Sequence, residues 1–124
     1  MANQTKVLIV EDDKFLSELI STKLDKEGFN IALAGDGETG LKKAEEFKPE
    51  IVLLDIMLPG MDGFEVLEKL KASPELKKIP VIILSNFGQE SKVERGLQLG
   101  AVDYLVKANF TTGEIVAKIK EILK

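Results

Sequence analysis

The chain has 124 residues, 17 of them basic and 21 acidic, and its formal net charge is −4. A weakly acidic domain is a poor candidate for holding nucleic-acid phosphates, so we expect no direct nucleic-acid binding. It contains no cysteine and no histidine, which excludes disulfides, zinc sites, thiolate nucleophiles and histidine-based catalysis. Chemistry is left to carboxylates, hydroxyls, lysine and arginine, together with hard cations such as Mg²⁺ or Ca²⁺.

The length and composition predict a single domain spanning residues 1–124. The N-terminus lacks the layout of a signal peptide. Its apolar runs are far shorter than the ~20 residues that a membrane helix needs. We therefore expect a cytoplasmic protein that does not enter a membrane.

The first half of the chain alternates strand and helix signals. Val7–Val10 is a continuous apolar run, typical of a strand buried on both faces of a parallel sheet. Apolar residues at helical spacing then predict a helix from Phe15 that Gly28 ends. Phe29–Ala34 is a weaker strand, expected at or near a sheet edge, and Glu38–Phe47 is the second helix.

The second half continues this alternation. The predicted elements follow in the order Ile51–Leu54, Asp62–Ala72, Val81–Leu84, Ser91–Leu99, Val102–Val106 and a final helix that Thr111 opens. Capping-box patterns are expected to begin the last two helices: Ser91 with Glu94, and Thr111 with Glu114.

Five strands alternating with five helices predict an α/β fold with right-handed crossovers. At this length we expect a flavodoxin-like doubly wound sheet of five parallel strands in the order 2-1-3-4-5. Ligands of such sheets bind beyond the carboxyl ends of the strands, where the strand order reverses. Here that place lies between the first and third strands.

Polar residues follow the strong strands at this edge. Glu11, Asp12 and Asp13 follow the first strand and Asp55 follows the third. Two carboxylates ~4 Å apart repel by roughly 4 kcal/mol at an effective dielectric constant of ~20. A divalent cation relieves this repulsion, and Mg²⁺ prefers carboxylate, carbonyl and water oxygens. Asp13 and Asp55 are candidate Mg²⁺ ligands, with Asp12 binding directly or through water.

The same residues suit phosphoryl transfer. The Asp55 carboxylate is a candidate nucleophile that accepts a phosphoryl group as an acyl phosphate. Mg²⁺ would neutralise one phosphoryl oxygen, Lys107 a second, and the Ser85 hydroxyl would bind the third.

Ordinary structural roles remain open for each residue. Asp12 or Asp13 could cap the first helix, Asp55 could be a turn residue, and Lys107 could be a solvated surface lysine. A further motif, Gly35–Gly40, matches the G-x-G-x-x-G pattern of dinucleotide-binding proteins. It follows the weakest strand in a short chain, so a glycine-rich turn before a helix is favoured.

Four segments together resemble the receiver domains of bacterial two-component response regulators, including the stand-alone chemotaxis regulators. These segments are Val7–Asp13, Asp55–Gly63, Pro80–Ser85 and Gly100–Lys107. The resemblance covers residues 6–123 and implies a phosphorylation-dependent switch in phosphorelay signal transduction rather than an enzyme acting on other substrates.

The resemblance assigns a role to each site residue. Asp55 is the implied phosphoacceptor, and Lys107 and Ser85 are its catalytic partners. The implied Mg²⁺ pocket consists of Asp12, Asp13, Asp55 and the backbone carbonyl of Met57. Ser85 and Tyr104 take the switch positions. The donor would be a phosphohistidine on a sensor histidine kinase or phosphotransfer protein, and the receiver would be a monomer or a phosphorylation-dependent dimer.

Three positions depart from the family pattern. Ala108 replaces the usual cis-proline after Lys107, so we expect a trans peptide bond and a rearranged loop at Ala108–Asn109. Asn86 stands where a small residue is usual, and we expect it to crowd the phosphoryl site or to order the hydrolytic water. Ser85 lacks the methyl group of the usual threonine, which is expected to loosen its coupling to Tyr104.

Phosphorylation adds about two negative charges to the site. We expect it to shift the surface formed by the fourth helix, the last strand and the final helix, and thereby to control a downstream protein. Candidate exposed residues of this surface are Lys92, Arg95, Gln98, Lys118 and Glu121. The alternatives are a receiver-like interaction module that is not phosphorylated, an aspartate-nucleophile phosphatase, and a flavin or dinucleotide protein.

Overall fold

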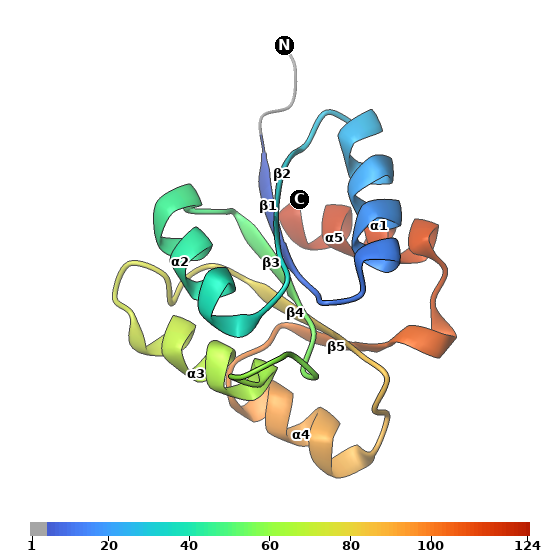
Figure 1. Ribbon diagram of the computed structural model, residues 1–124. Helices are drawn as coiled ribbons and strands as arrows, with labels where there is room; N and C mark the ends of the chain where they lie inside the picture. Colours follow the sequence, from blue (N-terminus) through green and yellow to red (C-terminus); the bar gives the residue numbers. More distant parts are fainter. Residues whose placement is uncertain (1–4) are drawn as a thin grey trace.

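The computed structural model describes residues 5–124, which form a sheet with helices on both faces (Figure 1). The strands are β1 (Lys6–Val10), β2 (Asn30–Ala34), β3 (Ile51–Leu54), β4 (Val81–Ser85) and β5 (Asp103–Val106). The helices that alternate with them are α1 (Lys14–Lys26), α2 (Gly37–Phe47), α3 (Gly63–Ala72), α4 (Glu90–Gln98) and α5 (Thr112–Leu123). A short 3₁₀ helix, η1 (Lys107–Asn109), separates β5 from α5.

The sheet is parallel throughout and has the order β2-β1-β3-β4-β5. This confirms the predicted topology and places the weakest predicted strand, β2, at an edge. The register aligns the carboxyl ends of β1 and β3, since Val10 pairs with Leu54, whereas β4 continues beyond Ile83, the partner of Leu54, and ends at Ser85. The segments that follow β1 and β3 therefore begin at one level of the sheet.

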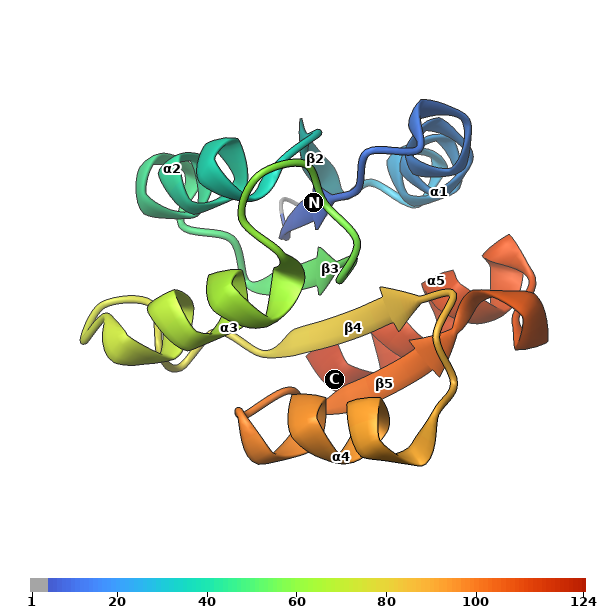
Figure 2. The same ribbon diagram turned by 60° about the horizontal axis from the view of Figure 1, so that its bottom comes forward.

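Alternate residues of each central strand pack on opposite faces of the sheet, in two separate core clusters. Val7 and Ile9 of β1 join a core cluster with residues of α1 and α5. Leu8 and Val10 join the other cluster, which includes residues of α2 and α3 together with Tyr104. Figure 2 shows α2, α3 and α4 on one side of the sheet and α1 and α5 on the other. Burial on both faces explains why these strands are continuously apolar.

Polar side chains cap the first turns of α1, α3 and α5. Asp13 accepts a hydrogen bond from Leu16 N (3.2 Å), and Asp62 accepts one from Glu65 N (3.0 Å). Thr111 and Glu114 form the predicted capping box.

The capping box predicted at Ser91 and Glu94 is wrong. Helix α4 begins at Glu90, and Gln89 is its N-cap without a side-chain cap bond. Ser91 therefore already lies inside the first turn, where the Glu94 N–H bonds to the helix backbone instead.

Two further expectations concern the backbone and membranes. Among residues 5–124 all peptide bonds are trans, which confirms the trans bond predicted after Lys107. The Ala108–Asn109 segment lies in η1. In the same part of the chain, none of the helices has the length and apolar character needed to span a bilayer.

Candidate functional site

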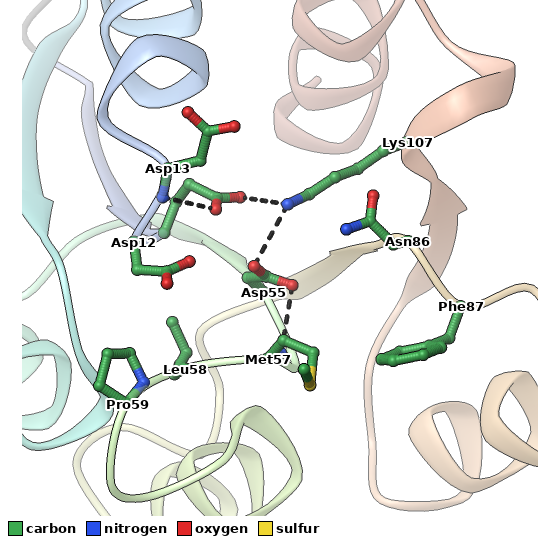
Figure 3. A pocket seen from close by; sticks show the side chains of 10 residues that line it. Asp12, Asp13, Asp55, Met57, Leu58, Pro59, Asn86, Phe87 and Lys107 are labelled. Carbon is green, nitrogen blue, oxygen red and sulfur yellow. Dashed lines mark hydrogen bonds and ion pairs between the residues drawn. The ribbon is translucent and has the colours of Figure 1, made fainter.

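A pocket of about 600 Å³ lies at the carboxyl ends of the strands (Figure 3). Its polar lining consists of Glu11, Asp12, Asp13, Asp55, Asn86 and Lys107, and its apolar lining of Met57, Leu58, Pro59 and Phe87. The loops after β1, β3 and β4 and the start of η1 supply these residues. The pocket lies where the strand order reverses, as predicted.

Three carboxylates converge in the pocket. Glu11, Asp12 and Asp55 each offer one oxygen atom, and these atoms lie within 4.8 Å of one another. Glu11 and Asp55 are buried, with 4% and 3% of their surface exposed, whereas Asp12 is exposed. Such a set of oxygen donors suits a hard divalent cation.

Lys107 joins the two buried acids. Its Nζ atom lies 2.9 Å from Glu11 Oε1 and 3.2 Å from Asp55 Oδ2. The other Asp55 oxygen, Oδ1, accepts a hydrogen bond from Met57 N at 3.3 Å. Both oxygens of the predicted nucleophile are therefore oriented by neighbouring donors.

The electrostatics reflect this burial. Burial raises the pKa of Glu11 to about 7, although hydrogen bonds from Lys107 and from the backbone of Asp13 work in the opposite direction. Burial also acts to lower the pKa of Lys107, but its hydrogen bond to Glu11 and the charge of Asp55 outweigh this effect and leave that pKa raised. Lys107 is therefore a cation at neutral pH and offsets part of the negative charge.

Asp13 lines the pocket but does not belong to the three-carboxylate group. Its Oδ1 caps α1, so the sequence alternative of a helix-capping role is the one that the structure shows for this residue. Glu11 takes the place among the carboxylates that the sequence prediction gave to Asp13. The strand register explains the position of Glu11. Val10 pairs with Leu54, so Glu11 and Asp55 are the next residues beyond the paired strand ends.

The two predicted switch residues meet at Phe87. Ser85 is completely buried, and its Oγ accepts a hydrogen bond from Phe87 N at 3.0 Å. The Tyr104 hydroxyl donates to Phe87 O at 2.6 Å, and its ring is buried with 8% exposed. Ser85, which was expected to face the crevice, is thus not among the residues that line the pocket.

A glycine allows α3 to approach the nucleophile. A side-chain carbon at Gly63 would clash with the carbonyl oxygen of Asp55 and would lie 2.6 Å from Ile56 Cα. Gly63 N also donates to Ile56 O at 2.8 Å. The start of α3 therefore packs directly on the backbone that carries Asp55.

The G-x-G-x-x-G segment is the turn between β2 and α2. Asp36 is the N-cap of α2, and its Oδ1 accepts a hydrogen bond from Thr39 N at 2.7 Å. This confirms the interpretation of a glycine-rich turn before a helix.

Comparison with known proteins decides the family. The family described as response regulator receiver domain matches residues 7–120. The chain belongs to this family. It is 39% identical to the phosphate regulon transcriptional regulatory protein PhoB of Rhizobium meliloti over 119 residues, which is 96% of this chain and 52% of that protein. The chain spans about half the length of the curated relatives it matches.

Solved receiver structures have the same fold. The Mn²⁺-bound form of response regulator Rcp1 matches with a TM-score of 0.84 and 29% identity, covering 96% of this chain and 94% of that one. The BeF₃-activated N-terminal receiver domain of Klebsiella pneumoniae RstA matches with a TM-score of 0.88 and 28% identity, covering 97% and 99%. Receivers of this family are signalling proteins of two-component systems.

Proposed function

We propose that this receiver is a phosphorylation-dependent switch in which Asp55 accepts a phosphoryl group. The observation that carries the proposal is the position of the Asp55 carboxylate, which lies in the pocket between two further carboxylates and Lys107. This arrangement supplies both a nucleophile and the positive charge that phosphoryl transfer requires.

The transfer forms one bond and breaks one. An Asp55 oxygen attacks the phosphorus of a phosphohistidine, an O–P bond forms, and the N–P bond breaks with its electron pair remaining on the imidazole. This chain contains no histidine, and we take the phosphohistidine to lie on a sensor histidine kinase or a phosphotransfer protein. In a separate hydrolysis step water attacks the phosphorus, the bond between the Asp55 oxygen and phosphorus breaks, and inorganic phosphate is released while the Asp55 carboxylate is restored. We take the domain to catalyse only its own phosphorylation and dephosphorylation.

The cluster of three carboxylates fits Mg²⁺ because it consists of hard oxygen donors with excess negative charge. Glu11, Asp12 and Asp55 would hold the ion, together with the carbonyl of Met57. When bound, Mg²⁺ neutralises charge on the phosphoryl oxygens. Lys107 binds a second phosphoryl oxygen, as its position beside Asp55 suggests.

The output surface is proposed to be α4, β5 and α5, of which β5 carries Tyr104 and α4 follows the loop after Ser85. Tyr104 on β5 links the site to this surface through its bond to Phe87 O. Arg95, Gln98 and Glu121 are exposed there, as expected. Lys92 and Lys118 are also expected to be exposed, but both are only partly exposed. Lys92 lies over the Phe87 ring, and Lys118 is paired with Asp103.

The test is intact-mass measurement after incubation with phosphoramidate or acetyl phosphate in the presence of Mg²⁺. The wild type is expected to gain one phosphoryl group and Asp55→Asn none, with circular dichroism showing that both are folded. Asp62→Asn is the matched control, because asparagine also caps helices and Asp62 lies outside the pocket lining. An unmodified wild type, or an Asp55→Asn protein that still gains phosphate, would contradict the proposal.

A further inference from the structure

We propose that the side-chain amide of Asn86 donates a hydrogen bond to the phosphoryl group on Asp55 and thereby slows its loss to water. This inference rests on the proposed function and concerns a residue next to, and distinct from, the predicted catalytic set. It extends the sequence expectation that Asn86 alters phosphorylation chemistry by assigning the interaction responsible.

The position of Asn86 is the first observation. It follows β4 directly and lines the pocket. Figure 3 shows its carboxamide extending into the pocket on the same side as Lys107 and above Asp55. Within residues 5–124 no residue forms a hydrogen bond with this side chain, which is exposed. Its two N–H donors are thus uncommitted.

The second observation is that few side chains in the pocket lining carry an N–H donor. Among the side chains described around the pocket, N–H donors belong to Lys107 and Asn86 alone. Lys107 is already shared between Glu11 and Asp55. The remaining polar side chains of the lining are carboxylates, which repel a phosphoryl group when ionised, and the rest are apolar.

The orientation of Ser85 is the third observation. Its hydroxyl oxygen is fully buried and faces Phe87 N, so in this arrangement it does not reach the pocket lining. A phosphoryl group has three terminal oxygens, and the cation and Lys107 account for two. Ser85 would have to turn away from Phe87 N to bind the third. The geometry points to Asn86 as a donor to the phosphoryl group that needs no such rearrangement, and its bond to an anionic oxygen belongs to the stronger, charge-assisted class.

The bond is also expected to slow hydrolysis. Water must reach the phosphorus of the acyl phosphate for Asp55 to leave. A carboxamide bound to a phosphoryl oxygen occupies part of the open pocket and holds the group in place. Loss of the side chain removes both effects, whereas an apolar side chain of similar size removes only the hydrogen bond.

The test compares Asn86→Ala, Asn86→Leu and Asn86→Asp in the Mg²⁺-loaded protein. Beryllofluoride, a phosphoryl mimic, is titrated by calorimetry, and the lifetime of the acyl phosphate is followed by intact mass. Loss of a hydrogen bond to a charged group predicts about tenfold weaker beryllofluoride binding for the alanine and leucine variants. The aspartate variant is expected to bind more weakly still, and the acyl phosphate of Asn86→Ala to be lost faster than that of the wild type.

The control is Asn30→Ala, an exposed asparagine at the amino end of β2, which is expected to behave as wild type. Wild-type affinity in Asn86→Leu, with a loss only in Asn86→Ala, would show that volume alone matters and would overturn the hydrogen bond. Wild-type affinity and lifetime in all three variants would overturn the whole inference. A wild-type protein that gains no phosphate would instead refute the proposed function.

Discussion

The ammonium group of Lys107 lies 3.2 Å from the Asp55 carboxylate, although 52 positions separate the two residues in the chain. Lys107 directly follows β5 and Asp55 directly follows β3, with β4 between these strands. The long lysine side chain spans this gap and also reaches Glu11. One cation is therefore shared by two buried acids, which leaves negative charge for a metal ion to neutralise.

The first prediction separates two neighbouring aspartates. Asp12→Asn is expected to weaken Mg²⁺ binding by at least about tenfold, since even the partners of metal ligands have effects of that size. Asp13→Asn is expected to bind Mg²⁺ as the wild type does, because Asp13 caps α1 and asparagine preserves the cap. Calorimetric titration with Mg²⁺ measures both affinities. Equal losses in the two variants would show that Asp13 contributes to the metal site.

The second prediction concerns the contact between α3 and the nucleophile. Gly63→Ala is expected to lower the free energy of unfolding by about 1–3 kcal/mol or more, because the added carbon overlaps the Asp55 backbone. Gly35→Ala is the matched control, since a side-chain carbon there meets no atom within 4 Å. Urea unfolding monitored by circular dichroism compares the two variants. A fully stable Gly63→Ala protein would mean that α3 shifts freely relative to Asp55.

The third prediction is a pH dependence of the metal-free protein. The pKa of Glu11 rises from its ordinary value of 4.5 to about 7 on folding, chiefly because the residue is buried. Between these values the folded state binds more protons than the unfolded state, so the contribution of Glu11 to stability is present below pH 4.5 and is lost as the pH rises through 7.

Glu11→Gln removes this titration. The stability advantage of the wild type at pH 5 over pH 7.5 is therefore expected to shrink in the variant, as measured by urea unfolding in the presence of a chelator. Other titrating groups affect both proteins alike, so the difference between the two slopes isolates Glu11. Parallel slopes would show that Glu11 has the same pKa in the folded and unfolded states.

The fourth prediction tests the link between Tyr104 and Phe87. Tyr104→Phe retains the buried ring and loses the hydrogen bond to Phe87 O, which is expected to lower the free energy of unfolding by about 1 kcal/mol. Tyr104→Ala is expected to have a larger effect because it also removes ring packing in the core. Urea unfolding measures both, and an unchanged Tyr104→Phe protein would show that water replaces this bond without loss.

Local sequence patterns predicted much of the fold. The continuous apolar runs predicted β1, β3 and β4, because such runs are typical of strands buried on both faces. Alternation with helices then left few topologies, and the predicted order is the observed one. The start of α4 was misplaced because the Ser91 pattern is locally valid, yet the helix begins one residue earlier. Such a boundary depends on how the preceding loop leaves β4.

Strand periodicity and chain order are local properties, so they identify which chemical groups stand at the carboxyl ends of the strands. Which of these groups meet depends on long-range packing. Strand register brings Glu11 level with Asp55, and the first turn of α1 engages Asp13 as its cap. The backbone of the β4–α4 loop turns the Ser85 hydroxyl to Phe87 and leaves Asn86 at the pocket. Side-chain direction after a strand depends on the packing of the following loop, which no local pattern specifies.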